Sequence, residues 1–321
     1  MRHVVLLQMG GPTTLADLRP FYQRLFADSS MIQLPPPLAA VQPGLARVVA
    51  AVRSRSMRAR YQQIGGGSPL LGHTVGLARA LAGELSRRGD HARVHVVMRY
   101  SEPSADAVAA ELTSCAASDV TLLPLYPHWS AATTGSSVED FARAARTVGL
   151  EANVRVVRAW GDDPGYVRLV TERIDAEREA LAREWDGPIY LLFSAHGLPV
   201  RYVERGDPYA DEVRCTARLV AERVHGFADW RLSFQSRMGP VQWLQPSTDK
   251  MLRSLASDGA RALVVVPLGF VSDHIETLYD LDIMYREEVQ SLGMRHYVRV
   301  PSFNADSGLA HVLADVLGRA A

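Results

Sequence analysis

The sequence predicts an α/β protein of two halves, each with a mainly parallel sheet flanked by helices. Short apolar runs rich in β-branched residues alternate with helical patterns along the chain, which is typical of repeated strand–helix–strand units. The chain has 321 residues, of which 47% are apolar. Because one hydrophobic core rarely serves so long a chain, we expect two domains.

The predicted strands are runs that end at Gly, Pro, Ser or His, as buried parallel strands do. They span residues 4–9, 94–98, 120–125, 154–157, 189–193, 232–234 and 262–267. The predicted helices span residues 15–26, 77–87, 105–112, 138–147, 166–185, 211–224 and 248–255, and a further helical run follows residue 273.

The helix that begins near residue 164 illustrates these predictions and marks the domain boundary. Asp163 can cap it, Pro164 suits its first turn, and apolar side chains recur along one stripe. The run from Trp160 to Pro164 breaks the pattern that precedes it. We therefore expect an N-terminal domain over 1–160 and a C-terminal domain over 161–321, whose last helix could pack back on the first domain.

Composition excludes several classes of partner. The 35 basic and 35 acidic residues cancel, so no broad field attracts nucleic acid. Two cysteines, Cys115 and Cys215, are too few for a disulfide framework or for a four-thiolate cluster within this chain. No run reaches the ~18 to 20 apolar residues that span a bilayer. We expect a cytoplasmic protein, in contact with a membrane only at its surface.

In sheets of this kind ligands bind beyond the carboxyl ends of the strands. There His196 follows a predicted strand, where an imidazole can accept a proton or bind a metal, or simply be a buried histidine bonded to a turn. Asp273 and Glu276 follow another strand and could form a capping box. Glu276 and Asp280, four residues apart on a helix, share a face that suits either a cation or plain solvation.

Two other features leave alternatives open. The runs 65–69 and 133–137 could bind an anion through backbone N–H groups, but neither matches a nucleotide fingerprint, so turns and helix starts are favoured. The proline-rich start at 34–37 leads into an aliphatic helix at 45–52, followed by arginines. On pattern alone, a packed core helix is the favoured interpretation of 45–52.

Eight segments along the chain stand out as motifs. They are LLQMGGP (6–12), YQQIGGGSP (61–69), MRY (98–100), YPHWSAATTGSS (126–137), FSAHGLP (193–199), RGDPY (205–209), FQSRMGPVQW (234–243) and FVSDHIETLYDLD (270–282). In this order they resemble the ferrochelatase family, whose members insert ferrous iron into a porphyrin. The resemblance implies two Rossmann-like domains of the chelatase type, with a porphyrin cleft between them.

The resemblance also implies roles for particular residues. His196 would be the active-site histidine and Glu276 its partner carboxylate, and both are the candidate catalytic groups and metal ligands. Asp273, His274 and Asp280 would form a polar path beside them. A porphyrin must lose two N–H protons and accept a cation, which calls for a base and carboxylates. We favour His196 as the proton acceptor over His196 as the metal carrier.

The implied porphyrin contacts are Met9, Arg99, Tyr126, Ser130 and Trp243. Arg99 becomes the candidate propionate partner because Gln62 and Gln63 stand where some relatives carry arginine. Members that act on coproporphyrin tend to carry tyrosine at the position of Met9, which favours protoporphyrin here. Met284 stands where many relatives have a third acidic residue.

The expected partners are a porphyrin and Fe²⁺ as substrates, with no nucleic acid. We expect a monomer with no permanently bound cofactor and no iron–sulfur cluster, since no cysteine follows Cys215. The segment 34–60 would form a lip over the porphyrin and could rest on a membrane. The alternatives are a coproporphyrin III ferrochelatase, a chelatase for another tetrapyrrole or metal, and a non-catalytic porphyrin or haem carrier.

Overall fold

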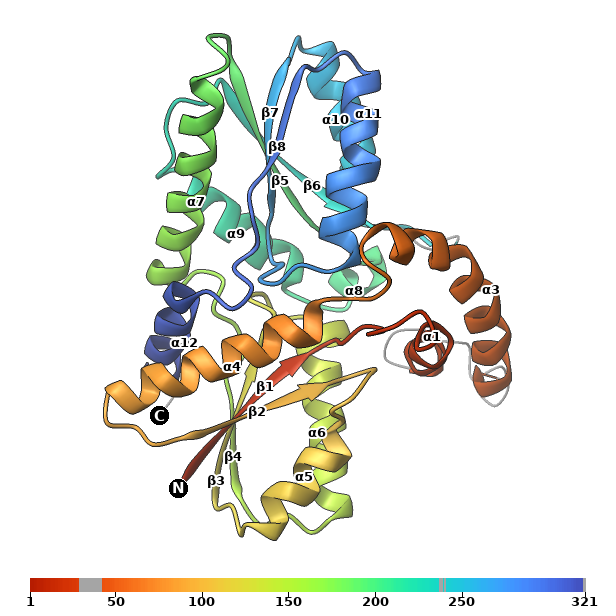
Figure 1. Ribbon diagram of the computed structural model, residues 1–321, viewed down its shortest axis with the longest axis vertical. Helices are drawn as coiled ribbons and strands as arrows, with labels where there is room; N and C mark the ends of the chain where they lie inside the picture. Colours follow the sequence, from red (N-terminus) through yellow and green to blue (C-terminus); the bar gives the residue numbers. More distant parts are fainter. Residues whose placement is uncertain (29–41, 237–238, 240, 320–321) are drawn as a thin grey trace. The chain divides into compact units, whose positions relative to one another are not determined.

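The structure, a computed structural model, describes residues 1–28, 42–236, 239 and 241–319. The chain forms two compact units (Figure 1). Unit 1 contains Met1–Tyr126, Ser130–Arg158 and Asn304–Ala321, and unit 2 contains Pro127–Trp129 and Ala159–Phe303. The chain thus crosses into unit 2 after Arg158 and returns to unit 1 for its last helix.

Unit 1 is built on a four-stranded sheet in the order β2-β1-β3-β4 with every pair parallel. Its strands are β1 (Arg2–Gln8), β2 (Arg93–Met98), β3 (Asp119–Pro124) and β4 (Asn153–Val156). Its helices are α1 (Leu18–Ala27), α3 (Gln42–Gln63), α4 (Leu70–Arg87), α5 (Ala105–Ser114), the π-type helix η1 (Ala131–Gly135), α6 (Ser136–Thr147) and α12 (Ser307–Arg319).

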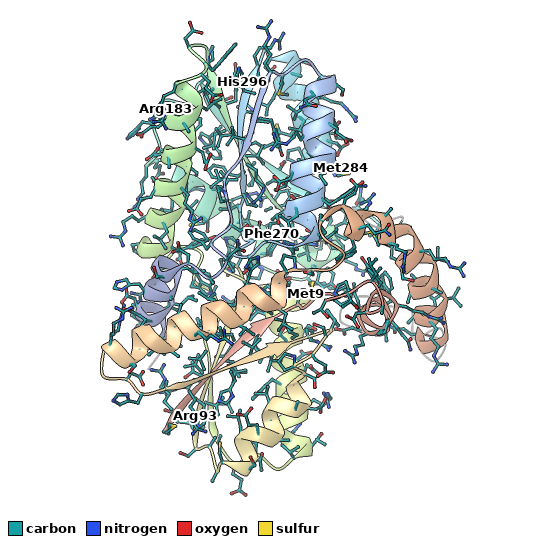
Figure 2. All side chains as sticks on the ribbon, in the orientation of Figure 1. Met9, Arg93, Arg183, Phe270, Met284 and His296 are labelled. Atoms are coloured by element: carbon teal, nitrogen blue, oxygen red, sulfur yellow. The ribbon has the colours of Figure 1, made fainter. Side chains whose placement is uncertain are left out.

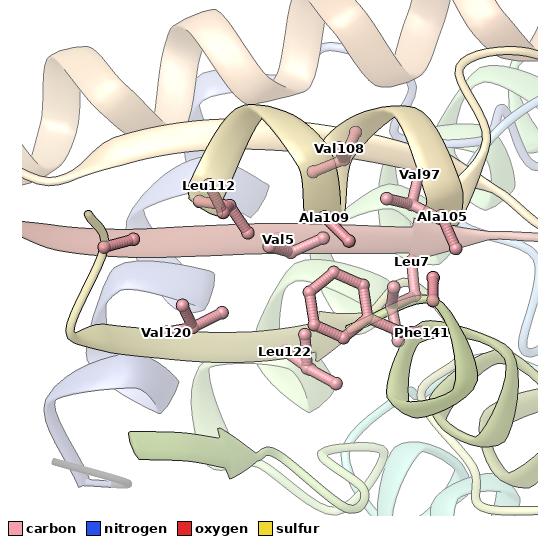
Figure 3. Packing of buried hydrophobic residues seen from close by; sticks show 12 residues of the cluster. Val5, Leu7, Val97, Ala105, Val108, Ala109, Leu112, Val120, Leu122 and Phe141 are labelled. Carbon is pink, nitrogen blue, oxygen red and sulfur yellow. The ribbon is translucent and has the colours of Figure 1, made fainter. Parts of the chain in front are cut away.

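The core of unit 1 lies between this sheet and helices α5 and α6. Val5 and Leu7, on one face of β1, meet Val108 and Leu112 of α5 and Phe141 of α6 (Figure 3). Helix α4 packs on β1 and β2, and α12 packs on α4. Both faces of the central strand are therefore covered, as the run of apolar residues predicts.

Unit 2 repeats this plan with a parallel sheet in the order β6-β5-β7-β8. Its strands are β5 (Ile189–His196), β6 (Asp229–Gln235), β7 (Ala262–Pro267) and β8 (His296–Arg299). Its helices are α7 (Pro164–Ala182), α8 (Val200–Glu204), α9 (Tyr209–Ala221), α10 (Thr248–Ser257), the π-type helix η2 (Glu276–Tyr285) and α11 (Arg286–Ser291).

A second core lies between this sheet and helices α10, η2 and α11. Leu252 and Leu255 of α10, Leu281 of η2 and Val289 of α11 pack there against Leu263 and other residues of the sheet. Helices α7 and α9 contact the strands too, and Figure 1 draws them on the other side of the sheet. The predicted fold class, two parallel sheets flanked by helices, is confirmed.

The structure extends several of the predicted elements. The helix predicted over 77–87 begins at Leu70, β8 was not predicted, and the expected last helix, which was predicted without bounds, is α12. The start of α7 agrees with the prediction, because Asp163 Oδ1 accepts hydrogen bonds from the backbone N–H groups of Gly165 and Tyr166 at 2.9 and 3.2 Å. Among the described residues, no helix combines the length and the apolar character needed to cross a membrane.

The glycine-rich run at 65–67 is a turn that packs against the loop after β1. The N–H of Ser68 donates to the carbonyl of Pro12 at 2.7 Å, and a Cβ on Gly67 would overlap the carbonyl oxygen of Thr13. The run at 133–137 joins η1 to α6. Both segments therefore form turns or helix starts, as favoured from the sequence.

Candidate active site

The centre of the candidate site is a hydrogen-bonded pair in unit 2. His196 ends β5, Glu276 begins η2, and His196 Nδ1 lies 2.8 Å from Glu276 Oε2. Since an ionised carboxylate only accepts hydrogen bonds, Nδ1 carries the proton and donates it. In the neutral imidazole the lone pair is then on Nε2. The side chains keep exposed fractions of 36% and 21%, so the pair remains accessible.

The two partners shift each other's pKa. Burial alone would lower the pKa of His196, but the charge of Glu276, the hydrogen bond and the charge of Asp280 outweigh it and leave this pKa above its ordinary value. Burial would raise the pKa of Glu276, but His196 chiefly brings it down to about 2. An imidazole that takes up a proton here is thus stabilised by an ionised carboxylate.

The segment that carries Glu276 is a π-type helix, whereas the sequence predicts an α-helix. Helix η2 covers Glu276–Tyr285 and includes Asp280, and such i→i+5 segments are rare and often occur at functional sites. Met284, labelled in Figure 2, lies on the same helix. Glu276 and Asp280, the acidic row predicted from the sequence, thus both lie on η2.

Asp273 and Glu276, the residues considered for a capping box, both have partners outside the helix. The residue that precedes η2 is Ile275, whose side chain makes no capping hydrogen bond. Asp273 Oδ1 instead accepts a hydrogen bond from Arg299 Nη1 at 3.1 Å, and the N–H of His274 donates to Thr277 Oγ1 at 3.0 Å. The guanidinium of Arg299 and the imidazole of His196 are therefore hydrogen-bond partners of these two carboxylates.

His274 differs from His196 in its electrostatics. Burial lowers the pKa of His274 below its ordinary value, although Glu276 and the Ser272 carbonyl oppose the shift. Its Nδ1 lies 3.0 Å from the Ser272 carbonyl oxygen, to which it donates. Phe270, labelled in Figure 2, contacts both imidazoles, with ring centroids 6.2 Å from His196 and 4.7 Å from His274. A neutral and a readily protonated imidazole therefore share one aromatic neighbour.

Two further residues hold the loop that follows His196. Tyr209 donates its hydroxyl proton to the carbonyl oxygen of His196 at 2.9 Å. Trp243 pairs with Pro199 in an isolated bridge, and a Cβ on Gly197 would lie 3.3 Å from Trp243 Cε3. Trp243, a predicted porphyrin contact, thus lies beside the histidine loop. Tyr209 and Phe270 were missed as site residues, although RGDPY and the 270–282 segment contain them.

The other predicted porphyrin contacts lie in unit 1, just beyond the carboxyl ends of its strands. Met9 and Arg99 follow the neighbouring strands β1 and β2, and Tyr126 and Ser130 follow β3. Ser130 Oγ accepts a hydrogen bond from the N–H of Ala132 at 3.2 Å and caps η1. The hydroxyl groups of Tyr126 and Ser137 lie 3.5 Å apart, and burial raises the pKa of Tyr126.

Arg99 already has partners within unit 1. Its Nη2 lies 2.7 Å from Asp28 Oδ2, its Nη1 lies 3.5 Å from Asp140 Oδ2, and its Nε donates to Ser136 Oγ at 3.0 Å. A propionate at Arg99 would have to compete with these two carboxylates. The role predicted for Arg99 as a propionate partner therefore finds no support in this geometry.

The described residues contain no cluster of three or more His, Cys, Asp or Glu side chains arranged to hold a metal ion. The groups of the site that could contact a cation are His196 Nε2 and the carboxylates of Glu276 and Asp280. Together they can accept protons, and the negative carboxylates can stabilise a cation that passes through the site.

Solved chelatases share this fold. The chain aligns over the full length of both proteins with CbiX, the terminal enzyme for biosynthesis of siroheme in denitrifying bacteria, at a TM-score of 0.55 and 16% identity. It also aligns with SirB from Bacillus subtilis, over 76% of this chain and 89% of that one, at a TM-score of 0.52 and 16% identity. The fold is therefore of the chelatase class.

Sequence comparison then specifies the family. The ferrochelatase profile matches residues 2–321. A ferrochelatase of Geotalea daltonii is 41% identical over 315 residues, 98% of this chain and 96% of that protein, and one of a Synechococcus species is 39% identical over 317 residues, 98% and 81% respectively. The chain belongs to the ferrochelatase family, and is thus an enzyme of the lyase class that inserts a metal into a tetrapyrrole.

Proposed function

We propose that this enzyme inserts Fe²⁺ into protoporphyrin IX, forming protohaem and releasing two protons, as the last step of haem synthesis. The observation that carries the proposal is the His196–Glu276 pair, with its 2.8 Å contact and its partly exposed imidazole. The substrate enters with two pyrrole N–H groups, and the divalent cation replaces both protons, so the reaction needs a base and no oxidant.

In this mechanism His196 Nε2 accepts the two pyrrole protons one after the other and releases each to solvent, while Nδ1–H stays bonded to Glu276. The carboxylate stabilises the imidazolium that forms, as the acidic partner of a catalytic histidine generally does. Glu276 and Asp280 offer the polar path by which charge passes to and from the site. His196 as a metal ligand is the alternative, in which Nε2 contacts Fe²⁺ before a pyrrole nitrogen does.

Turnover tests the proposal directly. Purified protein is mixed anaerobically with Fe²⁺, or with Zn²⁺ as a probe, and loss of porphyrin fluorescence is followed for protoporphyrin IX and coproporphyrin III in parallel. Met9 supports protoporphyrin as the preferred substrate. Faster turnover of coproporphyrin III would assign the enzyme to that substrate instead, and porphyrin binding without metal insertion would support the carrier alternative. A visible spectrum of the same protein tests the expected absence of an iron–sulfur cluster.

We also propose that α3 rests on a membrane surface. The first part of the predicted lip, Leu34–Val41, lies outside the described residues. Its second part belongs to α3, which has one buried face and one exposed face. Ala46, Ala50 and Met57 are buried, and α3 packs on α1, which agrees in part with the core-helix interpretation.

The opposite face of α3 is apolar and exposed. Leu45, Val48 and Val52 have exposed fractions of 46%, 64% and 66% and recur at helical spacing. Arg47 and Arg55 are exposed beside them. An apolar stripe with basic neighbours suits the surface of a bilayer that contains anionic lipids.

Vesicle flotation with a monomeric preparation, verified by its sedimentation, tests this contact. Replacing both Val48 and Val52 by Thr should reduce binding to anionic vesicles, with stability changing by less than about 0.5 kcal/mol because both sites are exposed. Val154 and Val156, exposed on β4, offer a matched pair for the same replacement. Equal binding by the two double variants would contradict the proposal.

A further inference from the structure

Gln235 lies in the site but is not one of the groups that the mechanism uses. It ends β6, directly opposite His196 in the register of β5 and β6, and its exposed fraction is 1%. Its Nε2 lies 3.4 Å from two acceptors of Glu276, the backbone carbonyl oxygen and Oε2. Oε2 is also the oxygen that accepts the proton of His196 Nδ1.

The direction of the Gln235 amide follows from its neighbours. On one side both atoms of Glu276 are acceptors, so only the NH₂ group of the amide can face them without repulsion. On the other side the Ser194 hydroxyl donates to Gln235 Oε1 at 2.7 Å. An amide turned the other way would place its oxygen against a carboxylate.

A chain of buried hydroxyl groups supports this direction. Ser194 Oγ lies 3.2 Å from Thr248 Oγ1, which lies 3.0 Å from Ser233 Oγ and accepts its proton. The carbonyl oxygen of Phe193, 3.3 Å from Ser233 Oγ, is a second acceptor for the same proton. Because Ser194 gives its single proton to Gln235, it accepts one from Thr248. Each hydroxyl therefore has a partner, and the chain ends at Glu276.

We propose that Gln235 is a positioning residue, whose amide, oriented by Ser194, holds Oε2 of Glu276 in place beneath His196. The carboxylate in turn keeps the proton of His196 on Nδ1 and leaves the lone pair on Nε2, toward the substrate. This inference rests on the proposed function, in which His196 is the base. Hydrogen-bonded partners of this kind orient the groups that react and are costly to remove.

The first test replaces Gln235 by Met, which has a similar length and no amide. We expect kcat for metal insertion to fall by about 10- to 100-fold, as is typical when such an orienting partner is lost, while the KM for porphyrin changes by less than about twofold. A purely structural role would lower the amount of folded protein and leave kcat per folded molecule unchanged. Gln290→Met, at an exposed position of α11, is the matched control.

The second test observes the imidazole itself. In ¹⁵N spectra of the ring nitrogens, with His196 assigned by comparison with His196→Ala, neutral wild-type His196 should carry its proton on Nδ1. The Gln235→Met variant should show both tautomers. A wild-type tautomer in that variant, or an unchanged kcat, overturns the proposal. If the wild type itself shows no metal insertion, the proposed function fails, and the spectra still decide whether Gln235 orients the pair.

A third variant serves if Gln235→Met does not fold. Ser194→Ala retains the amide and removes the donor that orients it, so kcat should fall by about 2- to 10-fold, the factor that one neutral hydrogen bond is typically worth. In the double variant, Ser194→Ala should add nothing to Gln235→Met, since its effect passes through the amide. Wild-type kcat in Ser194→Ala, or additive losses in the double variant, would overturn the inference.

Discussion

Two partly buried histidines of unit 2, His196 and His274, have opposite pKa shifts although both contact Phe270. Burial alone would lower the pKa of each imidazole. At His196 the hydrogen bond and charge of Glu276 reverse the shift, whereas His274 bonds to a backbone carbonyl and its pKa stays low. Sites that separate the pKa values of neighbouring groups often assign them different tasks. Here the protonatable residue is His196.

Replacing His196 by Ala should therefore remove the base. We expect turnover to fall by about 10² to 10⁴-fold, the usual contribution of a positioned general base. Unfolding should change little, because the imidazole is partly exposed at the end of a strand. Initial rates of metal insertion and a thermal melt measure both quantities, and a variant with near-normal turnover would refute the assigned role.

Glu276→Gln tests the partner separately. The amide oxygen can still accept the proton of His196 Nδ1, but the negative charge is lost. Because that charge helps to keep the pKa of His196 above its ordinary value, the acidic limb of the pH–rate profile should move to lower pH, and turnover should fall as the imidazolium loses its stabiliser. The profile from pH 5 to 9 is the measurement. An unmoved limb would mean that Glu276 does not set the pKa of His196.

At the scale of elements, the sequence predicts most strands but not the geometry of the site helix. The strand at 262–267 agrees with β7 to the residue, because it is continuous and apolar. The run His296–Arg299, in which polar and apolar residues are mixed, was not predicted to be a strand. Its pairing with β7, rather than its own pattern, makes it β8. The π-type geometry of η2 cannot be recognised in the sequence, because two side chains four residues apart share a face in an α-helix as well.

The pairing of His196 with Glu276 could not be derived from the pattern either. The residues are 80 positions apart, and only the tertiary fold brings β5 and η2 together. The family resemblance supplied this pair. It did not reveal that Gln235 and Arg299 support the site, because their roles depend on hydrogen bonds between elements distant in the chain.

Arg299 of β8 links its strand to η2 and to the loop that precedes η2. Its Nε and Nη2 bond to Asp282 of η2 at 2.7 and 2.8 Å, and its Nη1 bonds to Asp273 in the preceding loop. Breaking such a largely buried ion pair leaves uncompensated charge, so Arg299→Met should lower the free energy of unfolding by about 3 to 5 kcal/mol. Denaturant titration measures it, with exposed Arg295→Met as control. A loss of unfolding free energy no larger than that of the control would show that the bonds from Arg299 to Asp282 and Asp273 contribute little.

At the scale of the whole molecule, both units contain histidines held neutral. In unit 1 His3 Nδ1 lies 3.0 Å from His95 Nε2. Burial lowers the pKa of both, assisted by Arg93 and by the charge of His95 on His3, and opposed by Glu111. In unit 2 burial lowers the pKa of His128 to about 3, with Thr216 as its hydrogen-bond partner. Each unit therefore contains imidazoles that bind a proton more readily when it unfolds.

This predicts a loss of stability in mild acid. A group whose pKa is lowered by folding stabilises the fold fully above its unfolded pKa, near 6.5 for histidine, and less as the pH falls below it. His128 alone should remove up to about 1.4 kcal/mol per pH unit below pH 6.5. Carboxylates with lowered pKa values, such as Glu276 and Asp106, act in the same direction only nearer their own pKa range. The decline between pH 6.5 and 5 is thus assigned to histidine.

Denaturant titrations at pH 7, 6 and 5 test this assignment. Spectroscopic signals specific to each unit give its free energy of unfolding at each pH. In His128→Gln the pH dependence of unit 2 should become shallower, because the amide can still bond to Thr216 but cannot bind a proton in this range. His274, whose pKa burial also lowers, keeps part of the slope. In His3→Gln the pH dependence of unit 1 should flatten in the same way. His91→Gln, at an exposed position, should keep the wild-type slope. If His128→Gln and His3→Gln also keep that slope, the buried imidazoles do not cause the acid sensitivity, and carboxylates would have to explain it.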